Sequence, residues 1–207
     1  MRRIFAWLGC CNVPHKSAPA ELLTAAAGVI EEWCDGWYLF GAQAVLIWGR
    51  PRLTADVDVT IRLRTADTVS FWKAMEKAGF RLRVTDAEQF VARTRVLPFL
   101  HVATQLPLDV VLAGPGIEDT FIERAIRVEI EGLSVPVASP EDLIVMKVLA
   151  GRPKDLEDVR TVLTERLNRL DVAYIRSTLG MLEQALGQSD LLPVLDAEIA
   201  RAERQLP

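Results

Sequence analysis

The sequence predicts an α+β fold, in which a mixed β-sheet flanked by helices is followed by a C-terminal helical bundle. Two patterns support this prediction. Up to residue 138, short apolar strand patterns alternate with helical patterns, whereas from Ser139 onward only helical spacing recurs. A length of 207 residues with 50% hydrophobic residues suits one ordinary domain or a small domain with a helical appendage. We expect a tail at 1–18, a domain at 19–138 and a helical region at 139–207.

The first elements are predicted from the spacing of apolar residues and from Gly and Asp residues that end helices and strands. They are a helix over 20–34 that Asp35 and Gly36 would stop, a short buried strand over 37–40, and a short helix over 43–48. Further along, alternation predicts strands over 56–62, 80–84, 96–103, 107–112, 128–130 and 133–137, and helices over 67–77, 86–93 and 118–125.

The C-terminal region begins with a helix-start signal. Ser139 is an N-cap, Pro140 suits the first helical position, and Asp142 follows three residues after the cap as a variant of the capping box. Helices are expected over 140–150, 154–168, 171–186 and 189–205.

Two acidic residues alternate with valines in the strand over 56–62. Because side chains of a strand alternate between faces, Asp56 and Asp58 point the same way, with Cα atoms ~6.5–7 Å apart. Carboxylates at that separation can share hard cations such as Mg²⁺. The alternative is a strand with one solvated face, which needs no function.

A third acid lies in another apolar run. Asp109 is the single carboxylate of the strand over 107–112, and a buried Asp needs a partner or a metal ion. Asp109 could equally be a solvated edge residue. Together, however, Asp56, Asp58 and Asp109 favour a metal site, and the glycine turn at Gly41 would add N–H groups at a helix start that bind phosphate oxygens.

These motifs resemble those of a known superfamily. The Gly41 turn, the Arg52-Leu53-Thr54-Ala55-Asp56-Val57-Asp58 run, Asp109, and a later helix with Lys147 followed by Arg152-Pro153-Lys154-Asp155 resemble the DNA polymerase β-like nucleotidyltransferases. The closest branch is the AbiEii/AbiGii toxin-like group. The resemblance covers about residues 22 to 165 and is far more specific for the superfamily than for the substrate.

The resemblance implies a metal-dependent transfer of a nucleoside monophosphate from an NTP to a hydroxyl acceptor. It implies that Asp56, Asp58 and Asp109 are catalytic and bind Mg²⁺ or Mn²⁺, and it places 19–138 as the catalytic domain. The implied nucleotide-binding residues are Gly41, Ala42, Gln43, Arg52, Thr54, Lys147, Arg152 and Asp155. The partners would be the NTP, an RNA (tRNA) or protein acceptor, and a cognate antitoxin; the alternative acceptor is a small molecule such as an antibiotic.

One position departs from the superfamily pattern. Many members have Gly or Ser where this chain has Ala42, which can offer only its backbone N–H to a phosphate. Phosphate binding would then be weaker or shared with Gln43, Arg52 or Lys147. A module that binds nucleotides or partners with weak or lost activity is therefore the rival hypothesis.

Several candidate residues also have structural interpretations. Lys147 can be a lysine whose stem packs on a helix face, Thr54 an ordinary β-branched residue, and His101 a hydrogen-bonded core histidine. The charged residues after the helix that carries Lys147 can instead form salt bridges between two helices. These residues are Arg152, Lys154, Asp155 and Asp158, and we favour this structural interpretation for Asp158.

Net charge and cysteine content restrict the kinds of partner and the cellular compartment that we expect. A net charge of −4 argues against broad nucleic-acid binding, although the arginines of the acid-bearing half could form a local basic groove or a solvated surface. Three cysteines, two of them adjacent at Cys10 and Cys11, form no disulfide framework, which fits a reducing cytoplasm. The apolar run near Met1 is too short for a signal peptide, and no segment reaches a membrane span.

Overall fold

The computed structural model of the chain describes residues 16–50, 54 and 56–204. Within these residues the strands are β1 (Cys34–Phe40), β2 (Val57–Leu63), β3 (Phe80–Leu82), β4 (Val96–His101), β5 (Pro107–Leu112), β6 (Ile126–Ile130) and β7 (Leu133–Val137). The helices are α1 (Ala18–Trp33), α2 (Gly41–Trp48), α3 (Thr68–Lys77), α4 (Ala87–Thr94), α5 (Ile117–Arg124), α6 (Pro140–Ala150), α7 (Pro153–Arg166), α8 (Val172–Leu186) and α9 (Leu191–Glu203), with a 3-10 turn at Leu167–Arg169.

The strands form one mixed sheet in the order β3-β4-β5-β2-β1-β7-β6. The pairs β2–β5 and β1–β7 are parallel, and the other neighbours are antiparallel. The two acid-bearing strands β2 and β5 are therefore direct neighbours near the middle of the sheet. Their inner residues Val57, Val59, Leu108 and Val110 are fully buried, which anchors both strands in the core.

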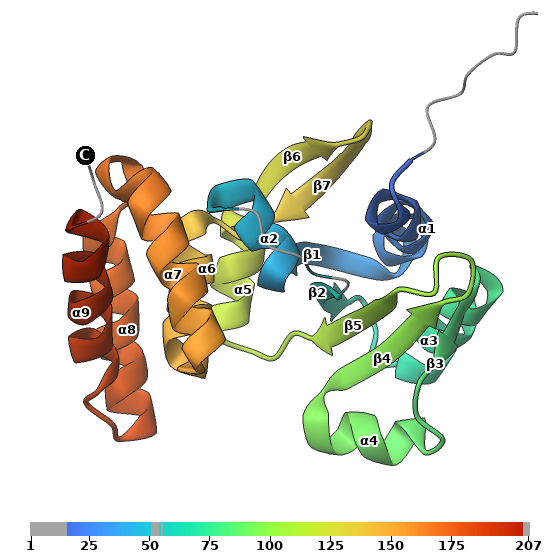
Figure 1. The fold of residues 1–207 in the computed structure, drawn as a ribbon. Helices are drawn as coiled ribbons and strands as arrows, with labels where there is room; N and C mark the ends of the chain where they lie inside the picture. Colours follow the sequence, from blue (N-terminus) through green and yellow to red (C-terminus); the bar gives the residue numbers. More distant parts are fainter. Residues whose placement is uncertain (1–15, 51–53, 55, 205–207) are drawn as a thin grey trace, which may run out of the picture.

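The helices divide into two groups around the sheet (Figure 1). Helices α1 and α3 pack on each other, α1 against β1 and β2 and α3 against β3, while α4 packs on β4. On the other side, α6, α7, α8 and α9 pack together, and the short α2 lies between β1–β2 and the pair α6–α7. This placement confirms the predicted α+β class with its C-terminal helices.

Most predicted elements are confirmed, and several of their bounds differ by a few residues at the start or the end. Asp35 and Gly36 do not stop a helix and precede no turn; they lie inside β1, which begins at Cys34 with an irregular register. Arg62 on the neighbouring strand binds Asp35 at 2.7 Å, so a tertiary contact overrides the local Asp-Gly turn signal. Asp56 lies just before β2, not within it.

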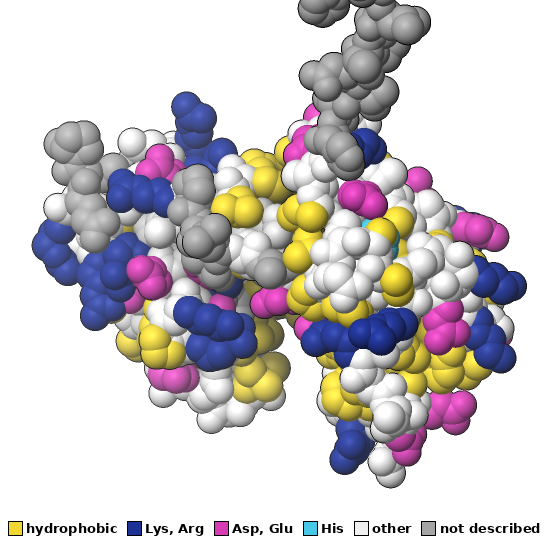
Figure 2. Space-filling view, turned by 45° about the vertical axis from the view of Figure 1, so that its right-hand side comes forward, with side chains coloured by type: hydrophobic (Ala, Val, Ile, Leu, Met, Phe, Trp, Pro, Cys, Tyr) yellow, Lys and Arg dark blue, Asp and Glu magenta, His cyan; other side chains and the backbone are white. Residues whose placement is uncertain are grey.

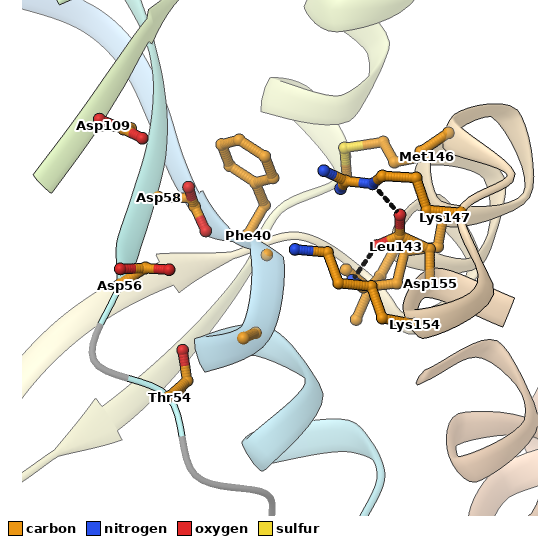
Figure 3. Close-up of a pocket in the computed structure, with 14 residues that line it drawn as sticks. Phe40, Thr54, Asp56, Asp58, Asp109, Leu143, Met146, Lys147, Lys154 and Asp155 are labelled. Carbon is orange, nitrogen blue, oxygen red and sulfur yellow. Dashed lines mark hydrogen bonds and ion pairs between the residues drawn. The ribbon is translucent and has the colours of Figure 1, made fainter. Parts of the chain in front are cut away.

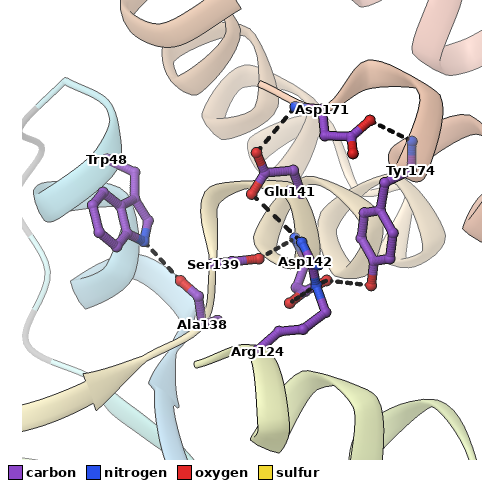
Figure 4. A network of polar contacts seen from close by, with 8 residues as sticks. All are labelled: Trp48, Arg124, Ala138, Ser139, Glu141, Asp142, Asp171 and Tyr174. Carbon is purple, nitrogen blue, oxygen red and sulfur yellow. Dashed lines mark hydrogen bonds and ion pairs between the residues drawn. The ribbon is translucent and has the colours of Figure 1, made fainter. Parts of the chain in front are cut away.

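A buried polar network fixes α6 to the rest of the molecule (Figure 4). The Asp142 side chain is fully buried; it accepts a 2.6 Å hydrogen bond from the Tyr174 hydroxyl and contacts Arg124 Nε at 3.2 Å. The Arg124 guanidinium lies 3.8 Å from the centre of the Tyr174 ring. Ser139 caps α6 as predicted, but Asp142 faces Arg124 and Tyr174, so its contacts join α5, α6 and α8.

The predicted domain boundaries stay predictions. The chain passes from β7 to α6 through Ala138 and Ser139, both buried, and Trp48 Nε1 of α2 donates to the Ala138 carbonyl oxygen at 2.7 Å. At the N-terminus, Ser17 caps α1, which starts at Ala18 inside the expected tail; residues 1–15, including Cys10 and Cys11, lie outside the described residues. No described helix combines the length and the hydropathy required to cross a membrane.

Candidate functional site

A cavity of about 310 Å³ lies where the sheet, α2 and the C-terminal helices meet (Figure 3). Its lining combines carboxylates, cations and an apolar surface: Phe40, Gly41, Ala42, Thr54, Asp56, Asp58, Asp109, Leu143, Met146, Lys147, Ala150, Arg152, Lys154 and Asp155. In the space-filling view, acidic side chains lie in the notch between the two halves of the molecule, with basic side chains on either side (Figure 2).

Three of these residues form one row across the sheet. Phe40 on β1 pairs with Asp58 on β2, and Asp58 pairs with Asp109 on β5. Residues in one row of a sheet point to the same face, at the strand spacing of ~4.8 Å. The structure therefore places the Asp58 and Asp109 side chains next to each other, although they are far apart in the sequence.

Asp56 completes the acidic side of the cavity. It is exposed, lines the same cavity, and in Figure 3 its carboxylate and that of Asp58 both lie toward the cavity. Gln43 holds the backbone beside it, since Gln43 Nε2 donates to the Asp56 carbonyl oxygen at 3.5 Å. Gln43 itself is buried and is not among the lining residues.

The environment of Asp58 disfavours its negative charge. Burial, followed by the nearby charges of Asp109 and Asp56, raises the pKa of Asp58 from 3.8 to about 6, against the opposing effect of Lys147 and Lys154. Such an excess of negative charge is what a bound cation would relieve. In donor chemistry the three carboxylates suit a hard divalent cation, although no three described acidic, His or Cys side chains are grouped closely enough to hold one.

Asp109 has a partner that the sequence did not reveal. Arg83 Nη2 contacts the Asp109 carboxylate, while Arg83 Nε donates to the Phe99 carbonyl oxygen at 3.0 Å. The Asp109 side chain is 39% exposed, so of the two predicted alternatives the solvated carboxylate is the nearer one, although β5 lies between β4 and β2 and is not an edge strand. An ion pair this exposed contributes at most about 1 kcal/mol, so Asp109 can exchange Arg83 for another partner at low cost.

Gly41 is required by the packing of the Asp58 side chain. Its φ of +64° lies in the left-handed region, and a Cβ added there would meet Asp58 Oδ2 at 2.0 Å. Helix α2 begins at Gly41, and its N-cap residue Phe40 makes no side-chain capping bond. The first N–H groups of α2 thus lie beside the Asp58 carboxylate, where they can bind anions.

We expect Gly41→Ala to lower the free energy of unfolding by about 1–3 kcal/mol, because it adds left-handed strain and displaces Asp58. Urea denaturation measures this loss. Gly28→Ala is the matched control: nothing lies within 4 Å of a Cβ at Gly28, inside α1, so this change should stabilise by about 0.5–1 kcal/mol. Equal effects of the two substitutions would contradict the packing argument.

The cationic side of the cavity contains a buried cluster. Lys147 is 7% exposed, and its Nζ lies 3.0 Å from Asp155 Oδ1 and 2.7 Å from Asp158 Oδ2. Arg152 also contacts Asp155. Lys147 is therefore not a surface lysine lying along a helix, and the favoured interpretation of Asp158 as a member of a salt-bridge set joining two helices agrees with its contact.

Lys154 is the cation that the sequence reasoning left out of the site. It is exposed, and Figure 3 shows its ammonium group pointing into the cavity toward the start of α2. Within the described part of the chain, Lys154 forms no ion pair, in contrast to Lys147 and Arg152. Its position beside Asp155 in the Arg152–Asp155 motif was the signal that could have identified it.

The structure brings together most of the predicted site residues. Gly41, Ala42, Thr54, Lys147, Arg152, Asp155 and the three acids line one cavity, whereas Gln43 lies behind it and Arg52 is outside the described residues. The sequence reasoning missed Phe40, Leu143, Met146, Ala150 and Lys154. His101, as predicted, is a buried residue with a 2.9 Å contact to Thr104 Oγ1.

Comparison with known proteins agrees with the fold. The family described as "Nucleotidyltransferase of unknown function (DUF6036)" matches residues 34–185, from β1 to near the end of α8. The solution structure of the antibiotic-resistance factor ANT(2'')-Ia is 18% identical and has a TM-score of 0.53, covering 84% of this chain and 99% of its own.

Two further structures share the fold. ANT(2'')-Ia in complex with adenylyl-2''-tobramycin, 18% identical, gives a TM-score of 0.52 over 79% of this chain and 99% of that one. An antigenic nucleotidyltransferase-like protein from Paracoccidioides brasiliensis, also 18% identical, gives 0.50 over 88% and 93%. At these identities the likeness is one of fold. No curated protein matches the chain.

Proposed function

Since the chain belongs to the nucleotidyltransferases of unknown function (DUF6036), we propose that its cavity transfers a nucleoside monophosphate from an NTP to a hydroxyl group. The observation that carries this proposal is the row of Asp58 and Asp109 beside the first N–H groups of α2. In this arrangement two adjacent carboxylates lie next to a helix N-terminus that can bind phosphate, and Lys154 lies across the cavity from the carboxylates (Figure 3).

The proposed roles follow from charge and position. Asp56, Asp58 and Asp109 would hold Mg²⁺ or Mn²⁺, which when bound neutralises phosphate charge during the transfer. The N–H groups of Gly41 and Ala42, with Lys154 and Arg152, would bind the triphosphate. Thr54 lines the same end of the cavity, and Arg52 stays a proposed contact.

The buried cluster would position these groups without touching the nucleotide itself. The Lys147 ammonium group contacts the carboxylates of Asp155 and Asp158, so protein groups already occupy it as partners. Asp155 in turn contacts Arg152 at the cavity rim. We therefore assign to Lys147 and Asp155 the placement of α7 and its two cavity cations, in place of direct phosphate binding.

Asp109 would act on the acceptor side. The acceptor oxygen forms a bond to the α-phosphorus, the bond from that phosphorus to the β-phosphate oxygen breaks, and pyrophosphate leaves with the electron pair. After release from Arg83, Asp109 would either ligate the metal ion on the acceptor side or accept the hydroxyl proton, and the second role is the one tested below. The protein supplies placement and charge, as in other phosphoryl transfers.

We expect Asp109→Asn to lower single-turnover transfer by ~10² or more while nucleotide affinity stays within a few-fold, because the proton acceptor acts only in the chemical step. Calorimetry and rapid-quench transfer on the same variant measure the two quantities. Arg83→Gln is the companion change, since it leaves the carboxylate in place; its transfer rate should stay within about tenfold of wild type. Near-normal transfer by a folded Asp109→Asn would remove Asp109 from the mechanism.

For the acceptor, the resemblance to the AbiEii/AbiGii toxin-like group supports a hydroxyl of RNA (tRNA) or of a protein, with a cognate antitoxin as partner. A small molecule is the alternative, because ANT(2'')-Ia, which shares the fold, has been seen with adenylyl-2''-tobramycin. Incubation of the protein with each α-labelled NTP, Mg²⁺ or Mn²⁺, and total RNA, total protein or aminoglycosides tests both. Label should enter one acceptor class and be lost with Asp58→Asn; no label in any class would favour the interaction module.

A further inference from the structure

One wall of the cavity is apolar and has no part in the proposed chemistry. We define the apolar wall as Phe40, at the end of β1, together with Leu143 and Met146 of α6. Leu143 is 1% exposed and backs the wall, whereas Phe40 and Met146 are half-buried. Figure 3 shows the Phe40 ring between Asp58 and Met146, so the wall directly adjoins the acidic side.

Neighbouring contacts hold the apolar wall in place before any ligand binds. The Phe40 ring meets the ring of Tyr38 edge-on, with centroids 6.0 Å apart and planes at 66°. The Tyr38 hydroxyl lies 3.9 Å from the Met146 sulfur, and Tyr38 itself is 1% exposed. A buried tyrosine thus contacts both half-buried members of the wall, so less of their side-chain motion remains to be lost on binding.

We propose that the apolar wall binds the nucleobase of the NTP by stacking, an inference that rests on the proposed function. The phosphate-binding N–H groups start at Gly41, the residue after Phe40, so the wall begins where the triphosphate site ends. Of the parts of an NTP, only the base has apolar faces that match a phenyl ring and a thioether. Sugar and phosphates are polar and suit the remaining lining.

The composition of the apolar wall also predicts how strongly the protein discriminates among the four bases. A phenyl ring, a leucine and a thioether provide no strong hydrogen-bonding group for the edge of a base. Stacking accepts every base, because each has a π-face. The affinities for ATP, GTP, CTP and UTP should therefore lie within about tenfold of one another, with purines the tighter ligands because they cover more of the wall.

The experiment compares ligands with and without a base. Calorimetry in Mn²⁺ measures the affinity of wild type, Phe40→Ala and Met146→Ala for the four NTPs and for inorganic tripolyphosphate, which has no base. Phe40→Tyr is the matched control because it keeps the ring. Phe40→Ala should weaken ATP binding about tenfold and leave tripolyphosphate binding within about twofold, Met146→Ala should act in the same direction, and Phe40→Tyr should bind as wild type does.

Four results would overturn the inference. Equal loss of ATP and tripolyphosphate affinity in Phe40→Ala would mean that Phe40 only supports the start of α2. A preference for one base beyond about 100-fold would require hydrogen-bond readout that the wall does not provide. Wild-type protein that binds neither NTPs nor tripolyphosphate would overturn the proposed function as well. Wild-type protein that binds ATP and tripolyphosphate equally well would overturn only the stacking of the base and would leave the proposed function standing.

Discussion

Replacing Asp58 by asparagine should nearly abolish transfer and at the same time stabilise the ligand-free protein at neutral pH. Transfer should fall by at least ~10²-fold, because the central carboxylate of the row is lost where charge develops. Stability should rise because the Asp58 charge is held in a buried place beside Asp56 and Asp109. Gain of stability with loss of activity is typical of a residue kept for function.

The pH dependence of this effect follows from the pKa of Asp58, which rises from 3.8 to about 6 on folding. Because the folded state binds the Asp58 proton more tightly than the unfolded chain, the charge of Asp58 lowers stability increasingly as pH rises from about 4 to about 6, and fully above that. The cost corresponds to ~3 kcal/mol at most. The advantage of Asp58→Asn should therefore be largest at pH 8 and about half as large at pH 5.

Chemical denaturation of wild type and Asp58→Asn at the two pH values measures the difference. Asp196→Asn is the control: Asp196 is 55% exposed and pairs with Arg176, so its replacement should change stability by less than about 1 kcal/mol at either pH. An Asp58→Asn variant that is less stable than wild type at pH 8 would show that the carboxylate is a structural group. Retained transfer in the same variant would remove it from the mechanism.

Replacing Arg124 by leucine should cause a large loss of stability, although Arg124 lies outside the cavity. Asp142 is fully buried, and Arg124 is the cation in contact with it, with Tyr174 as its hydroxyl partner. Removing the cation leaves a buried carboxylate uncompensated, which costs about 3–5 kcal/mol. The variant's free energy of unfolding, measured with urea, should fall by that amount.

The reason for this loss can be separated from lost packing. Arg124→Leu combined with Asp142→Asn removes both charges, so the double variant should recover part of the stability lost in Arg124→Leu alone. Arg176→Ala, which breaks an exposed ion pair with Asp196, is the matched control and should cost less than about 1 kcal/mol. A double variant no more stable than Arg124→Leu would assign the loss to packing of the arginine stem over Tyr174.

The network around Asp142 also connects stability to the site. Arg124 and Tyr174 hold the first turn of α6, and the same helix carries Leu143, Met146 and Lys147 into the cavity. Partial loss of this network should therefore weaken nucleotide binding even where the chain remains folded. Arg124 and Tyr174 lie 18 and 32 residues from Asp142 in the sequence, so no local pattern identified these contacts.

The sequence predicted the parts of the site whose signals are local. Alternation along a strand was sufficient to give Asp56 and Asp58 one face, and the glycine turn predicted the start of a helix, because both follow from the geometry of a few neighbouring residues. The N-cap Ser139 and the β6–β7 hairpin were predictable for the same reason. Family motifs added Asp109, Lys147 and the Arg152–Asp155 run as candidates.

Only the tertiary structure decided which of these residues meet. The register of the parallel pair β2–β5 sets Asp58 beside Asp109, and the packing of α7 on α6 buries Lys147 between Asp155 and Asp158. It also gave Asp109 the partner Arg83 and brought Phe40 and Met146 to one wall of the cavity. Strand register and helix packing minimise the energy of the whole core, so residues far apart in the chain are paired by contacts that no local pattern encodes.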